Sequence, residues 1–252
     1  MASPLQLKYL TKLSGARVLI LGGTSDIGFA VASAALEHGA KVIIAGSRMH
    51  RFEGALRLDR TLTRLKEAYP DPSYHRRLSG YACDLGVPEK LEENLSSLFK
   101  QVTTAAPQSS LIDHIIFAAG DSPEITDVTV DSVPSLSSLP LILAKLAPKH
   151  MKRISNSSIT LTSVSQLGLT RDLALELKPI RVNCVAPGAI HTELLDNIPP
   201  EQLQSIHENM SKDTVLGQVG NPVDVAEAYI YSMKDGFSTG SSIHSDGGRL
   251  LE

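Results

Sequence analysis

Cysteine is scarce in this sequence, and its distribution excludes two ways of stabilising a protein. Cys83 and Cys184 are the only cysteines, and they lie far apart without the paired spacing of zinc ligands. We therefore expect neither a disulfide framework nor a metal site. Such cysteine usage is typical of a reducing compartment, so the sequence predicts a cytoplasmic protein.

An excess of one charge and long apolar runs are also absent. The chain has 24 Lys and Arg against 27 Asp and Glu, a formal net charge of −3, and these residues are dispersed. A nucleic-acid binder would show a basic patch and a membrane protein a long apolar span, so neither class is expected. Residues 1–15 contain no apolar stretch long enough for a secretion signal. The expected partner is a small uncharged or anionic molecule.

Linkers, internal repeats and low-complexity segments are missing as well. The 252 residues, of which 42% are hydrophobic, can bury one substantial core, and no Ser- or Pro-rich stretch divides them. The sequence thus predicts a single domain over residues 1–252.

What the sequence does contain is a regular alternation of short apolar runs and helical segments. The runs predict strands at 17–21, 40–45, 80–85, 111–117, 158–163, 180–186 and 241–245. Between them, helices are predicted at 29–36, 51–69, 88–102, 139–151, 169–177 and 222–234. This order indicates an α/β fold, a Rossmann-like doubly wound domain whose seven-stranded, mostly parallel sheet has helices on both faces. Ligands of such sheets bind at the carboxyl ends of the strands.

A glycine turn follows the first predicted strand and opens the first helix. A strand, a tight glycine turn and a helix start place free N–H groups and the positive end of a helix dipole where a pyrophosphate can bind. A turn of this kind also occurs without any ligand, for backbone reasons alone. The candidate cofactor-binding residues of the turn are Gly22, Thr24, Ser25, Asp26, Ile27 and Gly28.

Six short motifs, in this order along the chain, resemble the short-chain dehydrogenase/reductase family. They are Gly22 to Gly28 after the first strand, Asp84-Leu85 after the third, Ala118-Ala119-Gly120 after the fourth, Ser163 after the fifth, Pro187-Gly188-Ala189-Ile190-His191-Thr192 after the sixth, and Ser245-Asp246-Gly247-Gly248 at the end. The resemblance covers nearly the whole chain.

The resemblance implies roles in binding a nicotinamide dinucleotide. Asp84 would accept a hydrogen bond from the adenine amino group, and residues 118–120 would pack beside the adenosine ribose. Ile190 and Thr192 would hold the nicotinamide carboxamide. A strand-end cap for Asp84 and ordinary turn chemistry for Pro187-Gly188 are the alternatives.

The residues after the second strand favour NADP(H) over NAD(H). A carboxylate there would hydrogen-bond the ribose diol of NAD, whereas a basic residue pairs with the extra phosphate of NADP. The chain has Ser47 and Arg48 there, with no acid before Glu53. Arg48 as a solvated surface charge is the alternative.

Asp26 stands where the family usually has Gly. A carboxylate near a pyrophosphate costs Coulomb energy, but Asp also caps the first-turn N–H groups of a helix well. We expect Asp26 to be the cap.

The catalytic set of the family is incomplete here. The resemblance implies Ser163 as the residue that polarises the substrate, followed on the next helix by a Tyr and a Lys four residues later. No tyrosine lies between Ser163 and Pro187, and that interval is much shorter than in the family. No Asn stands between Gly120 and Leu141 to support a proton-relay water. A shortened gene product, residues missing from the sequence as read, and a real pseudoenzyme are the three explanations.

Other acids lie near the expected pocket. His191, Asp121 and Glu124 could each transfer a proton, although solvated loop positions are the simpler interpretation. The segments 141–151, 158–163 and 169–177 are similar to fungal secondary-metabolism members of the family. Some of those lack the Tyr and Lys, yet reduce iminium-type substrates or guide cycloadditions.

Three functions therefore compete at this stage. They are an NADP(H)-dependent oxidoreductase acting on a carbonyl or imine, a non-catalytic cofactor-binding scaffold, and a non-redox catalyst that orients a reactive substrate in the cofactor pocket. The resemblance also implies a homodimer or homotetramer.

Overall fold

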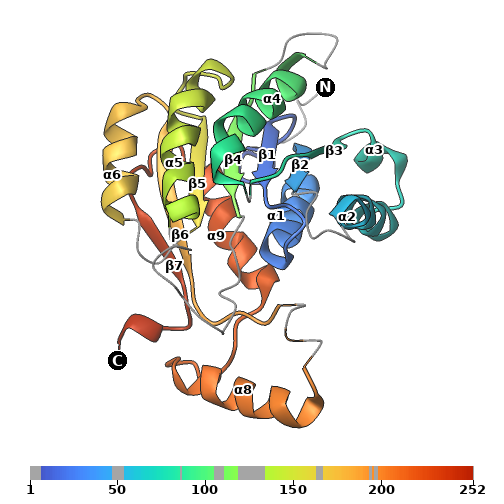
Figure 1. Cartoon of the computed structure of the whole chain (residues 1–252), viewed down its shortest axis with the longest axis vertical. Coiled ribbons are helices and arrows are strands. Elements are labelled where there is room, and N and C mark those ends of the chain that lie inside the picture. The colour runs from blue at the N-terminus through green and yellow to red at the C-terminus, as the bar shows by residue number, and fades with distance from the viewer. Residues whose placement is uncertain are drawn as a thin grey trace, which may run out of the picture.

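The strands form one sheet, as the alternating pattern predicts. The computed structural model describes residues 7–46, 54–85, 87–104, 111–118, 134–162, 167–192, 195 and 198–251. Seven parallel strands pair in the order β3-β2-β1-β4-β5-β6-β7 (Figure 1). Their bounds are β1 Arg17–Leu21, β2 Lys41–Gly46, β3 Leu78–Ala82, β4 His114–Phe117, β5 Ser158–Thr162, β6 Arg181–Pro187 and β7 Ser242–Ser245.

Helices cover both faces of this sheet. The α-helices are α1 Asp26–Glu37, α2 Gly54–Ala68, α3 Pro72–His75, α4 Leu91–Thr104, α5 Pro134–Leu146, α6 Leu167–Glu176, α8 Pro200–Lys212 and α9 Pro222–Lys234. There are also short 3-10 helices: η1 Pro88–Lys90 before α4, η2 Ala147–Lys149 after α5 and η3 Arg249–Leu251 after β7. One hydrophobic cluster packs α4, α5 and α6 on one face, and another packs α1, α2 and α9 on the opposite face. The fold class is therefore as predicted.

The strand order reverses between β1 and β4, and this reversal marks the expected position of a ligand site. β1 pairs with β2 on one side and with β4 on the other, so the chain crosses to the other half of the sheet there. The carboxyl ends of these two strands are the point where doubly wound sheets bind ligands. Buried aliphatic side chains such as Leu19 and Ile20 fill both faces of β1, as expected for a central parallel strand.

Several predicted boundaries were wrong, and packing explains the clearest case. β3 begins at Leu78 and ends at Ala82, earlier than the predicted 80–85, because Leu78 pairs with Val42 and Gly80 lies against Leu62 of α2. A Cβ at Gly80 would come within 2.7 Å of Leu62 Cδ1.

Other helices were missed or were predicted at displaced positions. α5 begins at Pro134, because proline is favourable in a first helical turn, and the helix includes Pro140. The prediction had α5 beginning only at 139. α3 and α8 were not predicted. α8 lies apart from the other helices, beyond the carboxyl ends of the strands (Figure 1). Within the described ranges, no helix is both long enough and apolar enough to cross a membrane.

Candidate functional site

The glycine turn closes tightly between β1 and α1. Gly22 has φ +85°, a backbone conformation that side chains rarely adopt, and its N–H donates to Ala45 O at 2.8 Å. A Cβ at Gly28 would lie 2.2 Å from Gly22 O, so only glycine lets the helix start this close to the strand end. The tight glycine turn that the sequence predicted is therefore present between β1 and α1.

The residue that caps α1 is Ser25, which corrects the expectation for Asp26. Ser25 Oγ accepts a hydrogen bond from Gly28 N at 3.1 Å and donates to Gly22 O at 2.8 Å. Asp26 is the first residue of the helix, where its carboxylate interacts favourably with the positive end of the helix dipole. The capping position was missed because two adjacent residues of the motif are both good caps.

Neighbouring strand ends come together around the turn. Thr24 lies over Gly46 at the end of β2, where a Cβ would come within 2.7 Å of Thr24 Cγ2. Ser25 Oγ is 3.5 Å from Ala118 O, just after β4. The first turn, the end of β2 and the start of the Ala118 motif therefore share one edge of the sheet.

Asp84 and Leu85 follow β3 at the same edge. Cys83 N donates to Gly46 O at 2.9 Å, and Asn94 Nδ2 of α4 donates to Asp84 O at 2.8 Å. Leu85 packs against the cluster under α4 and α5. Burial raises the pKa of the Cys83 thiol to about 12, so this cysteine is not a reactive thiolate at neutral pH.

The motif after β6 contacts both β7 and the segment that follows α8. A Cβ at Gly188 would lie 2.6 Å from Asp246 Cα, so glycine permits the close approach of the two strand ends. Ile190 forms a parallel bridge with Gly220 and packs, partly buried, against the hydrophobic cluster under α1 and α9. Thr192 O accepts a hydrogen bond from Leu195 N at 2.8 Å. Pro187 is the last residue of β6.

Some predicted site residues lie outside the described residues. These are Ser47 and Arg48 after β2, Ala119 and Gly120 after β4, the substitute acids Asp121 and Glu124, and the catalytic candidate Ser163 after β5. The helix after Ser163, α6, has 10 residues, close to the short helix that the sequence predicted.

A buried tyrosine contacts the end of β5, and the sequence analysis did not predict this contact. Tyr229 of α9 is 0% exposed, and its hydroxyl lies 2.5 Å from Thr162 Oγ1. Thr162 Oγ1 in turn donates to Phe117 O. Burial raises the pKa of Tyr229 further above its usual value. This hydroxyl chain fixes the residue just before Ser163, and the buried Tyr229 is a structural tyrosine rather than an exposed proton donor.

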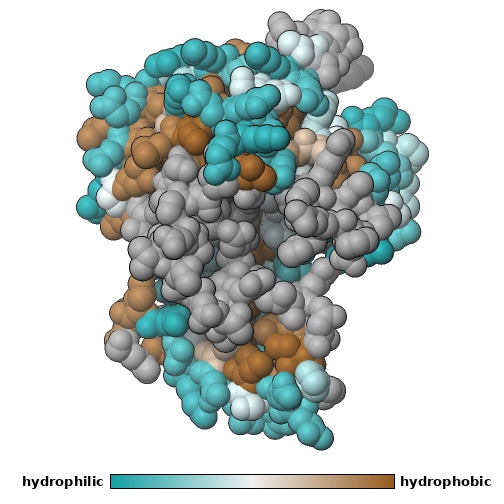
Figure 2. Space-filling view, in the orientation of Figure 1, coloured by the Kyte–Doolittle hydropathy of each residue, from teal (hydrophilic) through white to brown (hydrophobic). Residues whose placement is uncertain are grey.

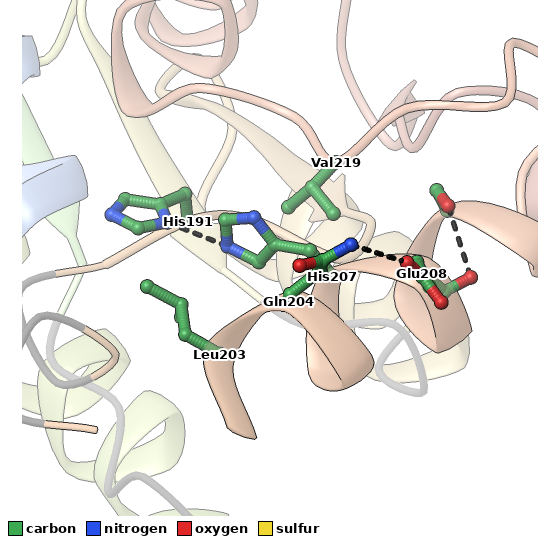
Figure 3. Close-up of a pocket in the computed structure, with 7 residues that line it drawn as sticks. His191, Leu203, Gln204, His207, Glu208 and Val219 are labelled. Carbon is green, nitrogen blue, oxygen red and sulfur yellow. Dashed lines mark hydrogen bonds between the residues drawn. The ribbon is translucent and has the colours of Figure 1, made fainter. Parts of the chain in front are cut away.

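A second missed feature is a pair of histidines beside the predicted carboxamide-binding segment. His191 Nδ1 lies 2.9 Å from Nε2 of His207, which comes from α8 (Figure 3). The pair borders a cavity of about 540 Å³ lined also by Leu203, Gln204, Glu208, Ser211 and Val219. No sequence pattern linked the two histidines, because the helix that carries His207 was not predicted.

The residues of this edge fit a dinucleotide. The turn leaves no Cβ at Gly22, Gly23 or Gly28, and the positive end of the 12-residue helix α1 lies beside it. A pyrophosphate bound there would accept hydrogen bonds from backbone N–H groups, and the nicotinamide end would extend toward Ile190 and Thr192. Among the described residues no cluster of potential metal ligands is present.

Comparison with known proteins agrees with this geometry. The profile of the SDR-like Rossmann domain matches residues 9–252. The short-chain dehydrogenase/reductase malC of Malbranchea aurantiaca is 37% identical over 264 positions, which cover 95% of this chain and 96% of the relative. The short-chain dehydrogenase/reductase ATR9 of Stachybotrys chlorohalonatus is also 37% identical, over 95% of this chain and 99% of its own.

A solved structure gives the same result in three dimensions. The structure described as MalC reductase/Diels-Alderase from Malbranchea aurantiaca superposes with a TM-score of 0.82 and 35% identity, covering 97% of this chain and 100% of that one. The malC alignment runs over 264 positions, more than the 252 residues of this chain, so it includes positions where this chain has no residue. The resemblance to fungal members is thus confirmed. The chain belongs to the short-chain dehydrogenase/reductase family.

Proposed function

We propose that this protein is an NADP(H)-dependent oxidoreductase that reduces a carbonyl or imine of a small secondary-metabolite substrate. The observation that carries the proposal is the Gly22 to Gly28 turn at the positive end of α1, placed where the strand order reverses. The family membership supports it, as does the name reductase printed for the MalC structure.

When bound, the coenzyme supplies a hydride to the substrate carbon. The residues of this chain orient it and the substrate: the turn holds the pyrophosphate, and Ile190 and Thr192 hold the carboxamide. Ser163 donates a hydrogen bond to the heteroatom on which negative charge develops. An iminium substrate needs no proton at that heteroatom, so reduction of such a substrate tolerates the loss of the family's tyrosine.

Preference for the phosphorylated coenzyme depends on Arg48. Its guanidinium pairs with the extra phosphate, and β2 ends in Gly46 without a carboxylate that would repel it. A charged hydrogen bond of about 1.5–3 kcal/mol corresponds to a roughly 10- to 100-fold change in Kd. Isothermal titration with NADPH and NADH should show this preference in the unmodified protein.

Arg48→Asp should weaken NADPH binding by at least that factor, and it should not weaken NADH binding, because a carboxylate there can hydrogen-bond the ribose diol. Arg57→Asp on the exposed side of α2 is the matched control, because it makes the same charge change further along the chain. Uptake of neither coenzyme by folded protein would refute the proposed function. Binding without oxidation of NADPH by any ketone, imine or iminium substrate would favour the scaffold function.

A non-redox cyclisation is the second candidate, because the MalC structure is described as a Diels-Alderase as well as a reductase. In this function the coenzyme pocket orients a reactive diene and dienophile without electron transfer. Product formation that continues with oxidised coenzyme would favour cyclisation.

The proposal includes self-association through the face formed by α5 and α6. Hydrophobic surface gathers over these helices (Figure 2), and Leu141 and Leu175 are 54% and 70% exposed. Leu175→Glu should lower the mass measured by light scattering, whereas Val223→Glu on α9 should not. A monomeric unmodified protein would contradict this part of the proposal.

A further inference from the structure

The two histidines described above belong to different elements and meet edge to face. His191 follows β6, His207 lies within α8, and their ring centroids are 5.0 Å apart with an interplanar angle of 78°. The 2.9 Å separation of Nδ1 and Nε2 is a hydrogen bond. Both side chains are partly buried.

The backbone holds His191 at a defined distance from the sheet. His191 N donates to Gly220 O at 2.9 Å, and Gly220 N donates to Ala189 O at 2.8 Å. These bonds anchor the segment between Ile190 and Thr192. The backbone of His191 is therefore held by Gly220, whereas His207 is held by α8.

The geometry restricts how the pair carries protons. The gap between Nδ1 of His191 and Nε2 of His207 has room for one hydrogen, so two charged rings would bring two N–H groups face to face. With a single positive charge, the pair has one hydrogen in the gap and one on each outer nitrogen. Glu208 also lines the cavity, and its Oε1 accepts a hydrogen bond from Gln204 Nε2 at 3.0 Å.

We infer that His191 and His207 form a proton relay that supplies the proton the missing tyrosine would give. This inference rests on the proposed function. Figure 3 shows Nε2 of His191 on the side of the ring away from His207. His191 is the catalytic residue, because its neighbours Ile190 and Thr192 hold the carboxamide. His207 is a positioning residue that acts through His191.

The relay balances the reduction of a neutral ketone or imine. The reduced coenzyme gives a hydride, with its two electrons, to the substrate carbon, and the C=O or C=N π bond breaks. The heteroatom takes the proton from His191 Nε2. His191 Nδ1 takes the hydrogen from His207 Nε2, which leaves both rings neutral, each with its hydrogen on Nδ1. After the product leaves, water returns a proton to His191 Nε2 and the pair regains its single charge. The products are an alcohol or amine and the oxidised coenzyme.

A comparison of two substrate types tests the relay. A cyclic ketone or neutral imine needs both hydride and proton, whereas an N-alkyl iminium salt needs only hydride. His207→Gln keeps one hydrogen bond to His191 but cannot pass a proton, and His207→Phe keeps only the ring. Both variants should reduce the neutral substrates at least 10- to 100-fold more slowly in single turnover. Their rate with the iminium salt and their Kd for NADPH should change less than about twofold.

Gln202→Ala, an exposed residue on the same helix, is the matched control and should change neither rate. Equal losses on both substrate types in the His207 variants would show a structural role and overturn the relay. Unchanged rates on both types would also overturn it. Failure of the unmodified protein to reduce even the iminium salt would instead refute the proposed function.

A measurement without coenzyme tests the pair itself. In protein labelled with ¹⁵N-histidine, the two rings should titrate together by NMR, and His207→Gln should shift the titration midpoint of His191. Gln202→Ala should leave that midpoint unchanged. Independent titration of the two rings in the unmodified protein would overturn the relay, whatever the turnover measurements show.

Discussion

At the scale of single residues, Gly28 controls how closely α1 follows β1. A side chain there would lie 2.2 Å from a backbone oxygen, which cannot move without shifting the turn. Gly28→Ala should therefore lower the free energy of unfolding by about 2–4 kcal/mol and weaken coenzyme binding. Urea unfolding and calorimetric titration measure the two effects.

Gly168→Ala is the control for this substitution. Gly168 lies in α6 with no atom within 4 Å of an added Cβ, so alanine should raise the free energy of unfolding by up to about 1 kcal/mol. Equal effects of the two substitutions would contradict the steric argument.

His114 makes stability depend on pH. It is buried on β4 with Nδ1 2.8 Å from Ser158 Oγ, and burial lowers its pKa from 6.5 to about 4. As the pH falls through this range, the unfolded chain gains a proton that the folded chain does not. The free energy of unfolding contributed by His114 is therefore complete above pH 6.5 and falls as the pH drops toward 4.

From about pH 7.5 to about pH 5 the loss from this one residue should be about 2 kcal/mol. Urea unfolding at both pH values measures it. In the His114→Asn variant, the free energy of unfolding should fall by about 2 kcal/mol less over the same pH range than in the unmodified protein. The variant should also be less stable than the unmodified protein at the higher pH. The same pH dependence in both proteins would refute the assignment.

At the scale of elements, Arg181 joins β6 to the end of α9. Its guanidinium donates to Ser232 O at 2.7 Å and to Met233 O at 3.0 Å, two carbonyls of the last helical turn. It also donates to Ser155 O at 2.7 Å. Because lysine lacks the planar fork, Arg181→Lys should lower the free energy of unfolding by about 2–4 kcal/mol.

Arg153→Lys provides the comparison for Arg181. Arg153 donates an exposed hydrogen bond to Lys178 O at 3.1 Å. Arg153→Lys should therefore change the free energy of unfolding of the protein by less than about 0.5 kcal/mol. Urea unfolding of both variants at one pH is sufficient. If the two substitutions lowered the free energy of unfolding equally, the buried hydrogen bonds of Arg181 would contribute no additional stability.

Prediction of elements from the sequence succeeded where the apolar pattern was strong. The bounds of β1 and α9 agree with the prediction at both ends, because a continuous apolar run and a Pro at the helix start mark them. α8 was missed because its sequence is mostly polar. The shift of β3 came from its pairing with β2, which no local pattern specifies.

At the scale of the whole molecule, coenzyme binding should stabilise the fold. The proposed site joins the ends of β1, β2, β4 and β6, so a ligand there must dissociate before these strands separate. NADPH at 100 times its Kd should add about 2.7 kcal/mol, or a rise of about 5–10 °C in Tm. Thermal unfolding with NADPH and NADH measures it, and no shift with either would contradict the site.

The sequence by itself determined the order of the strands and of most helices along the chain, the glycine turn and the motifs that follow the strands. These depend on local periodicity and backbone conformation, which neighbouring residues control. Only the tertiary structure decided that Ser25 caps α1, that Tyr229 holds Thr162, and that His207 meets His191. Tyr229 and Thr162, like His207 and His191, lie on different elements, so only packing brings them together. Ser25 and Asp26 are adjacent and both suited to cap a helix, so the local sequence does not decide between them.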